Sequence, residues 1–159
     1  MATIVESVVI RRPVEDVFRF YTDFRNLPRF LGDVMAVEQI GASTWRWTIQ
    51  GPLGLEVTWT IEVTETLPDQ LIRYETVGLA ALRTRWDVYF TRRPNPDETE
   101  VCEVMMPPLA GVGRATLELL GKPPAAEMAA NLRRLKELME TGRVTYVRHA
   151  VAGKFDHQP

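Results

Sequence analysis

The sequence predicts an α+β fold in which one antiparallel sheet packs against a long C-terminal helix. Apolar and polar residues alternate along most of residues 34–106, which is the pattern of strands with one buried face. Short stretches rich in Pro, Gly, Asn and Asp separate the alternating segments and favour tight turns between antiparallel neighbours. Beyond residue 124 the apolar residues recur every three or four positions instead, which indicates a helix.

The N-terminal region predicts a strand followed by two short helices. Residues 3–11 are rich in Val and Ile, which favour a strand, and Pro13 ends it. Proline at a first helical position and two acidic residues in the first turn predict an amphipathic helix over residues 13–22. Its apolar residues at helical spacing are Val14, Val17, Phe18 and Tyr21. A second helical turn is expected at residues 26–31.

Residues 34–106 predict six or seven strands joined by short turns, and therefore an antiparallel sheet. Strands are expected within residues 34–50, 55–66, 71–77, 82–91 and 99–106, with turns at 51–54, 67–69 and 94–97. The most regular strand is 55–66, whose apolar positions are Leu55, Val57, Trp59, Ile61 and Val63. We expect this apolar face to be buried and the opposite face to meet water.

The last helix is predicted by four apolar residues at helical spacing. They are Met128, Leu132, Leu135 and Met139. We expect them to bury one stripe of the helix against the sheet, and the helix to end near Gly142, since glycine suits a helix C-terminus. Pro123 and Pro124 should interrupt helical structure that begins at residues 115–120 and help to form the mouth of a cavity.

A single domain of residues 1–143 followed by a tail of residues 144–159 is the expected organisation. A chain of 159 residues has room for one domain, and 45% hydrophobic with 25% charged residues is an ordinary globular composition. Residues 144–159 show no sustained apolar period, so we expect the tail to be extended or mobile.

Charge and cysteine content exclude several classes of function. Lys and Arg number 19 and Asp and Glu 21, which gives a net charge of -2 and leaves no basic block for nucleic acid. No apolar run reaches the about 18–20 residues that span a bilayer, and the N-terminus lacks the pattern of a signal peptide. The single cysteine, Cys102, excludes a disulfide framework and a cysteine-based zinc site. We therefore expect a cytoplasmic protein without integral membrane association.

Three segments carry a resemblance to a known family. They are VIRRPVEDVFRFYTDFRNLPRF near the start, PLGLEVTWTIEVTETLPDQLIRYET in the sheet and LLGKPPAAEMAANLRRLKELMETG at the C-terminal helix. Over residues 3–143 the chain resembles the START-like, Bet v 1-like (SRPBCC) superfamily, in its polyketide cyclase/dehydrase-type branch. The resemblance implies a helix-grip fold, with two short helices after the first strand and a curved antiparallel sheet wrapped around the long C-terminal helix. It also implies an apolar cavity between sheet and helix, but it offers no catalytic motif to transfer.

The four tryptophans are the candidate ligand-binding residues, because all lie on the apolar side of predicted strands. They are Trp45, Trp47, Trp59 and Trp86. With Tyr74 and Phe90 they are expected to line a pocket for an apolar or aromatic ligand, since such pockets are mostly hydrophobic. The alternative is that these rings are ordinary core.

Polar groups able to act on a ligand are scarce. Glu103 alternates with Val101 and Met105, whereas Cys102 falls on the other face of the same strand, so one of the two faces the cavity. An inward Glu103 would have a raised pKa and could act as a general acid or base; otherwise it is an exposed strand carboxylate. Cys102 is expected to be an inert small hydrophobe, because neither histidine lies in a predicted element.

No metal site or cofactor is predicted. His149 and His157 lie in the expected tail, without the further ligands and fixed geometry that a metal site needs. Neither a GxGxxG nor a GxxxxGK motif is present, so no nucleotide cofactor is expected. Basic residues are interleaved with acidic ones and should form solvated, ion-paired surfaces. These residues are Arg73, Arg83 and Arg85 on the strands and Arg133, Arg134 and Lys136 on the last helix.

Three functions follow as hypotheses. The leading one is a domain that binds a small hydrophobic or aromatic molecule, lipid-like or polyketide-like, between the sheet and the last helix. The enzyme alternative is a polyketide cyclase, aromatase or dehydrase with unassigned catalytic residues. The second alternative is a protein-interaction module that docks through residues 107–112 and the last helix. If the tryptophan side chains are close-packed and no cavity reaches about 300 Å³, the binding hypothesis fails and the interaction-module hypothesis is preferred. Ligand identity, pathway and oligomeric state stay open.

Overall fold

The structure is a computed structural model that describes residues 3–108 and 124–158. Within these residues, the strands and α-helices in chain order are β1 (Ile4–Ile10), α1 (Val14–Thr22), β2 (Val34–Gln39), β3 (Thr44–Gln50), β4 (Glu56–Leu67), β5 (Leu71–Thr76), β6 (Arg85–Arg92), β7 (Thr99–Met106) and α3 (Pro124–Thr141). Short 3-10 helices are η1 (Phe24–Arg29), η2 (Pro52–Gly54) and η3 (Ala80–Leu82). The predicted boundaries at residues 3–11, 13–22 and 99–106 are confirmed to within a residue.

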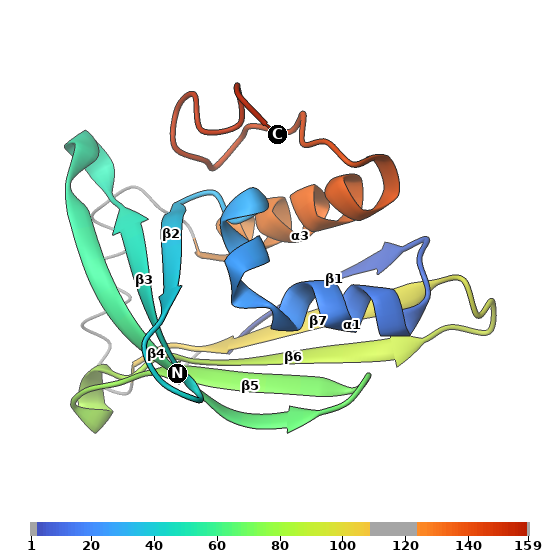
Figure 1. Ribbon diagram of the computed structural model, residues 1–159, viewed down its shortest axis with the longest axis horizontal. Coiled ribbons are helices and arrows are strands. Elements are labelled where there is room, and N and C mark those ends of the chain that lie inside the picture. Colours follow the sequence, from blue (N-terminus) through green and yellow to red (C-terminus); the bar gives the residue numbers. More distant parts are fainter. Residues whose placement is uncertain (1–2, 109–123, 159) are drawn as a thin grey trace.

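Within the described residues, the strands form one antiparallel sheet in the order β1-β7-β6-β5-β4-β3-β2. Figure 1 shows the sheet curving around the helices, with α1 and α3 both on its concave side. This is the helix-grip arrangement, so the predicted α+β fold is confirmed. None of the described helices combines the length and the hydropathy needed to cross a membrane.

The sheet register brings large side chains onto the concave face. Trp47 of β3 lies opposite Trp59 of β4, and Tyr74 of β5 lies opposite Trp86 of β6. Trp86 is in turn opposite Met105 of β7. Because directly opposite residues of antiparallel strands project to the same face, these side chains form one largely apolar wall.

The helix α3 buries the stripe that the sequence predicts. Its buried residues include Met128, Leu132, Leu135 and Met139. Pro124 is tolerated at the start of α3 because an N–H group there has no partner within the helix. Gly142, with a φ of 82°, follows the last helical residue and donates its N–H to the Leu138 carbonyl at 2.8 Å, as expected of a helix C-terminus. The predicted helical stretch at 115–120 and Pro123 lie outside the described residues.

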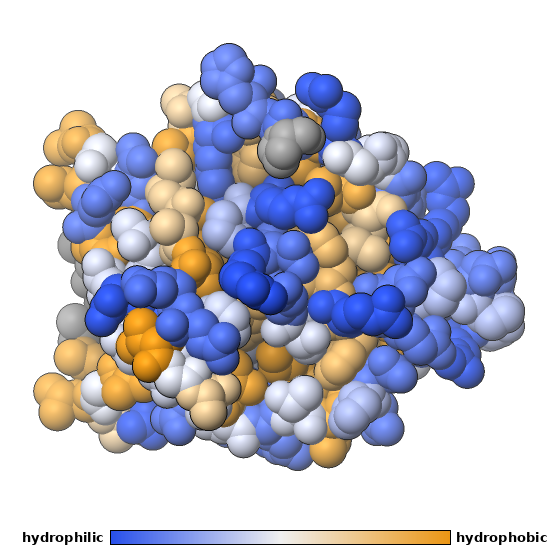
Figure 2. All heavy atoms as spheres, in the orientation of Figure 1, coloured by the Kyte–Doolittle hydropathy of each residue, from blue (hydrophilic) through white to orange (hydrophobic). Residues whose placement is uncertain are grey.

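The beginning of β4 differs from the prediction of one buried face. Leu55 is 66% exposed and Val57 46% exposed, whereas Ile61 further along the strand is buried. Figure 1 shows that the β3–β4 hairpin extends beyond α1 and α3, so the alternation continues where neither helix covers the sheet. Apolar surface is visible at this end of the molecule in Figure 2. Leu82, expected on a strand, lies in η3 and is also exposed.

The arginines of the outer sheet face are ion-paired, as expected, around one aspartate. Arg73 Nε lies 2.8 Å from Asp87 Oδ1, and Arg85 approaches the same carboxylate at 3.2 Å. Burial alone would raise the pKa of Asp87, but the hydrogen bonds from Arg73 and Arg85 hold it below its ordinary value.

The C-terminal segment, residues 144–158, packs against the domain. Phe155 belongs to the hydrophobic core, and Lys154 Nζ donates to the backbone carbonyls of Leu31 and Val34. Figure 1 shows the segment turning back over α3. The expectation of a mobile tail is therefore wrong for these residues: a single aromatic anchor and polar contacts hold the segment without any apolar period.

Arg134 is enclosed, so the expectation of a solvated helix face is wrong at this position. Its side chain is 0% exposed. The guanidinium donates from Nε to the Phe30 carbonyl at 2.7 Å and from its terminal nitrogens to Asn131 Oδ1 and the Arg148 carbonyl, each at 2.6 Å. These bonds satisfy a buried cation and join α3 to the end of η1 and to the C-terminal segment.

Candidate functional site

A cavity lies between the concave face of the sheet and the N-terminal half of α3. Its aliphatic wall comprises Leu31, Val34, Ile49, Met105 and Met128. The volume is about 100 Å³. This is below the about 300 Å³ of ordinary ligand pockets, so the described residues do not enclose a full-sized pocket. A cavity of roughly 150 Å³ can hold benzene, so the enclosed space suits a group no larger than one ring.

Four of the predicted residues form the aromatic wall of this cavity: Trp47, Trp59, Tyr74 and Trp86. The rings of Tyr74 and Trp86 stack with centroids 5.2 Å apart and an interplanar angle of 20°. Trp47 and Trp59 each lie 6.3 Å from Trp86. The rings are therefore contiguous and present one continuous surface.

Trp45 and Phe90, also predicted to bind a ligand, lie outside the described lining of this cavity. Trp45 packs against Phe24 of η1 with centroids 5.4 Å apart. Phe90 contacts Phe18 of α1 edge-on at 5.2 Å. Both project to the concave face, but α1 and η1 cover that part of it, so both are core residues.

Glu103 faces the cavity, which resolves the choice between Glu103 and Cys102. Val101, Glu103 and Met105 are the buried residues of their part of β7, whereas Cys102 is on the opposite face. Glu103 is 6% exposed and makes no hydrogen bond to another described residue. Burial raises its pKa to about 7, because a charged carboxylate is poorly stabilised away from water.

Two tyrosine hydroxyls form a polar pair near Glu103. The hydroxyls of Tyr21 and Tyr74 are 2.8 Å apart and fully buried, and either can donate to the other. Burial raises the pKa of both phenols, and the negative charge of Glu103 raises it further. Both therefore stay protonated at neutral pH.

Polar side chains at the α3 side of the cavity are Asp33, Glu127 and Asn131. Asn131 Oδ1 accepts a hydrogen bond from the Gly32 N–H at 2.9 Å as well as the one from Arg134. Asp33 and Glu127 interact electrostatically with Arg134. Asp33 also interacts with Lys154, whose pKa burial lowers to about 7.

Trp47 lines the cavity with its ring, but its indole nitrogen is shut away from solvent. Among the described residues, Nε1 is buried without a hydrogen-bond partner. Buried polar atoms are normally paired, so this nitrogen is a local cost of packing the tryptophan into the wall.

Neither Cys102 nor the histidines form a reactive or metal-binding site in the described structure. Burial raises the pKa of the Cys102 thiol, which is the opposite of what activates a nucleophile. His149 and His157 are exposed on the C-terminal segment. No group of three His, Cys, Asp or Glu side chains among the described residues could hold a metal ion.

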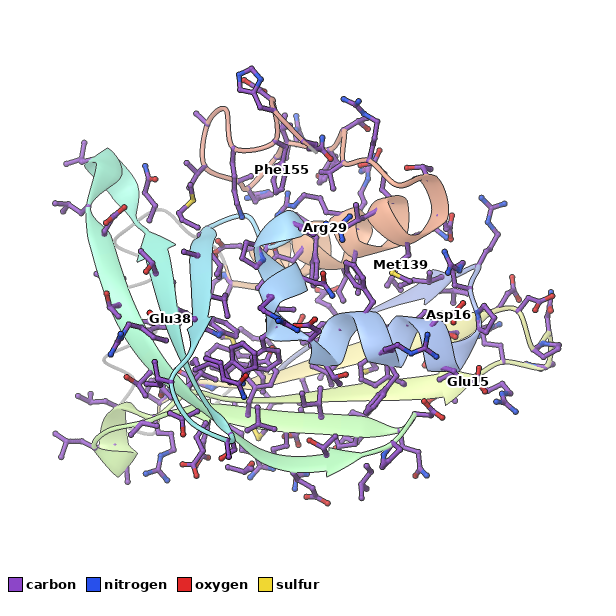
Figure 3. The ribbon with its side chains drawn as sticks, in the orientation of Figure 1. Glu15, Asp16, Arg29, Glu38, Met139 and Phe155 are labelled. Carbon is purple, nitrogen blue, oxygen red and sulfur yellow. The ribbon has the colours of Figure 1, made fainter. Side chains whose placement is uncertain are left out.

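A larger hollow of about 470 Å³ lies between α1 and the C-terminal half of α3, where Figure 3 labels Asp16, Arg29 and Met139. Its walls include the ion pair of Arg12 with Asp16, 3.1 Å apart, in which both partners are partly exposed. Paired and hydrated side chains need no ligand. The candidate site is therefore the smaller cavity that contains Glu103.

Comparison with known proteins assigns the family. Residues 1–140 match the family described as polyketide cyclase / dehydrase and lipid transport. The chain belongs to this family. An uncharacterised 17.2 kDa protein of Streptomyces lincolnensis is 28% identical over 78 residues, which are 49% of this chain and 51% of that protein. The chain therefore spans about half the length of this curated relative.

Several solved structures share the fold of this chain at low sequence identity. A protein of Deinococcus radiodurans superposes with a TM-score of 0.68 at 24% identity, covering 89% of this chain and 99% of that one. A protein of Thermus thermophilus has a TM-score of 0.67 at 21% identity, covering 89% of this chain and 99% of that one. A protein of Geobacillus kaustophilus has a TM-score of 0.68 at 14% identity, covering 89% of this chain and 97% of that one. Identities this low support the fold alone.

Sequence reasoning missed three polar residues of the site: Asp33, Glu127 and Asn131. A usable signal was present for two of them. Glu127 and Asn131 are one helical turn apart and flank the predicted core residue Met128, so they lie at the edge of the buried stripe. Asp33 follows Gly32 in a loop, and no periodicity predicts which way a loop side chain points.

Proposed function

We propose that this domain binds a small hydrophobic or aromatic molecule, lipid-like or polyketide-like, in the cavity between the sheet and α3. The observation that carries the proposal is an aromatic wall facing a cavity that also contains the buried carboxyl of Glu103. Ligand sites are mostly apolar and contain a few polar groups that fix orientation. A family described by cyclase, dehydrase and lipid transport activities supports the same proposal.

The small volume limits which part of a ligand is enclosed. About 100 Å³ holds no more than one ring or a short length of chain, so we propose that the rest of the molecule extends past Pro124 and Glu127. Volume alone would favour the interaction-module hypothesis. Docking of another protein on the surface, however, gives no reason to bury the Glu103 carboxyl in the sheet, where no described residue forms a hydrogen bond with it. Residues 109–112 of the surface named for that hypothesis lie outside the described residues.

A pair of variants on neighbouring residues tests the proposal. Met105→Trp adds a ring to the cavity wall, whereas Met106→Trp adds the same ring to the opposite face of β7. We expect calorimetry with a panel of fatty acids, sterols, flavonoids and aromatic polyketides to identify a saturable ligand that also raises the Tm. Met105→Trp should weaken its binding at least about tenfold and Met106→Trp should not. Equal affinities in the two variants, or no ligand in the panel, would overturn the proposal.

A second candidate function is an intramolecular cyclisation of a poly-β-keto chain. The observation that favours it is Glu103, whose raised pKa of about 7 suits a group that both takes and returns a proton. Its carboxylate would remove a proton from a carbon between two carbonyls, and that carbon would bond to a ketone carbon of the same chain. The resulting alkoxide would then take the proton back from Glu103, so the reaction needs no oxidant or reductant.

Turnover of a synthetic poly-β-keto thioester distinguishes this candidate from binding alone. Glu103→Gln should reduce kcat by about 10²–10⁴-fold while leaving affinity within a few-fold. Absence of turnover by the unmodified protein, or unchanged kcat in Glu103→Gln, would leave binding as the function.

A further inference from the structure

The ionisable side chains that line the cavity are all acidic within the described part of the chain. Glu103 lies on the sheet side, and Asp33 and Glu127 lie toward α3. Arg134 interacts electrostatically with both Asp33 and Glu127, and Lys154 with Asp33, so Glu103 is the acidic group on which the inference depends. A ligand carboxylate placed beside Glu103 would meet a like charge, and like charges brought together away from water repel strongly.

Among the described residues, no basic group or hydrogen-bond donor is paired with the Glu103 carboxyl, so a ligand group could fill that role. The groups facing it are Tyr21 from α1, Tyr74 from β5 and Glu6, its register partner on β1. None of these is basic, and Val88, opposite on β6, is apolar. A buried carboxyl without a hydrogen-bonding or charged partner is destabilising, so a ligand group that supplies one gains free energy.

We infer that the ligand is an amine: a flat or aromatic body bearing an ammonium group that pairs with the Glu103 carboxylate against the aromatic wall. This inference rests on the proposed function and names its ligand class. An ammonium supplies charge-assisted hydrogen bonds to a carboxylate. Aromatic rings attract a cation through their quadrupoles, and Trp47, Trp59 and Trp86 all line the cavity. A single binding mode thus satisfies both the carboxyl and the rings.

The pH dependence of affinity separates an amine from a neutral ligand. An ammonium binds the ionised carboxylate, so its affinity should rise as pH increases through the Glu103 pKa of about 7. A ketone or alcohol oxygen that accepts from the protonated carboxyl should bind more weakly as pH rises. Amines and neutral ligands are therefore expected to change affinity in opposite directions as pH rises.

Three probes with one ring and different end groups make the test: 2-phenylethylamine, 2-phenylethanol and 3-phenylpropanoate. Each is titrated by calorimetry and by NMR at about pH 6, 7 and 8. At about pH 8 we expect the amine to bind at least about tenfold more tightly than the alcohol, and the carboxylate to bind most weakly. The amine's affinity should fall by up to about tenfold per pH unit on acidification below pH 7.

Glu103→Gln should abolish the preference for the amine over the alcohol and the pH dependence of amine affinity, while the affinity for the alcohol stays unchanged. The control is Glu62→Gln, which replaces an exposed carboxylate on β4 and should alter neither the preference nor the pH dependence. Alcohol binding as tight as amine binding, or amine affinity that falls as pH rises, overturns the inference and leaves the proposed function standing. Failure of all three probes to bind at the cavity overturns both. If Glu103→Gln does not fold, the pH series on the unmodified protein still shows whether amine affinity rises or falls with pH.

Discussion

Glu103 owes its chemistry to its neighbours in the sheet. Its strand, β7, lies between β1 and β6, so both edges of the strand are paired, and the helices cover its inner face. Burial removes most of the hydration of the carboxyl, and its pKa rises to about 7. Alternation along β7 predicted that either Glu103 or Cys102 faces the cavity. It could not show which of the two does so, because the face that β7 turns inward depends on its register with strands far away in the chain.

The raised pKa predicts how stability depends on pH. The unfolded chain releases the Glu103 proton near the ordinary value of 4.5, and the folded chain releases it near 7. The folded state therefore binds more protons between these values, and the contribution of Glu103 to the free energy of unfolding falls as pH rises, levelling off above 7. We expect the protein to lose roughly 3 kcal/mol relative to Glu103→Gln between about pH 4.5 and 7.5.

Denaturant titrations of both proteins across this pH range measure the difference. Glu62→Gln serves as the control and should run parallel to the unmodified protein, because its carboxylate is exposed. A difference between the protein and Glu103→Gln that is constant with pH would show that the carboxyl is hydrated in solution.

At the scale of elements, α3 is held by its buried stripe. Leu132 is buried in the middle of this stripe. We expect Leu132→Ala to cost about 2–5 kcal/mol in denaturant titration, because it leaves a cavity against the sheet. Leu53→Ala, at an exposed site in η2, should change stability by less than about 0.5 kcal/mol. An equally small effect at Leu132 would contradict the described packing of α3.

The C-terminal segment behaves as an element although it contains no helix or strand among the described residues. Its anchor, Phe155, is buried in the core, with the guanidinium of Arg134 5.5 Å from its ring centroid. We expect Phe155→Ala to cost about 3–5 kcal/mol and His157→Ala, two residues further on and exposed, to cost almost nothing. Equal, small effects in thermal unfolding would mean that the segment is detached in solution.

Elements with a strong period were predictable, whereas contacts without a period were not. Alternation placed Trp47 and Trp86 on the concave face, because one side of each strand is buried along its length. The same alternation continued through Leu55, where no described helix covers the strand, so the exposed hairpin was missed. Phe155 was missed for the opposite reason: one aromatic residue among polar neighbours gives no periodic signal.

For the molecule as a whole, the loop at residues 30–34 joins the N-terminal and C-terminal parts. Its Gly32 carbonyl accepts from the Val151 N–H at 2.9 Å, and Lys154 bonds two further carbonyls of the loop. The same loop contributes Asp33 to the cavity. The shape of the cavity therefore depends on a segment that does not itself line it.

Gly32 provides the test of this arrangement. A Cβ at this position would lie 2.3 Å from the His149 carbonyl oxygen and 2.8 Å from an Arg134 nitrogen, so the backbones would have to separate. We expect Gly32→Ala to cost about 1–3 kcal/mol and to weaken ligand binding at the cavity. Gly41→Ala, whose Cβ would meet Thr44 at an ordinary 3.5 Å, is the matched control. Unchanged stability and affinity in Gly32→Ala would show that the loop and the segment are not tightly joined.

The pairing of β1 with β7 also bears on how the protein is made. Ile10 lies opposite Thr99, so β1 leaves the ribosome well before β7, the strand with which it pairs. Topologies rich in such distant pairings fold slowly, on the order of milliseconds to seconds. During that interval the Val and Ile side chains of β1 are accessible to chaperones and to other nascent chains. The cavity beside Glu103 is completed only after this late closure, so a ligand of the kind proposed could stabilise the finished protein but could not guide the early steps of its synthesis.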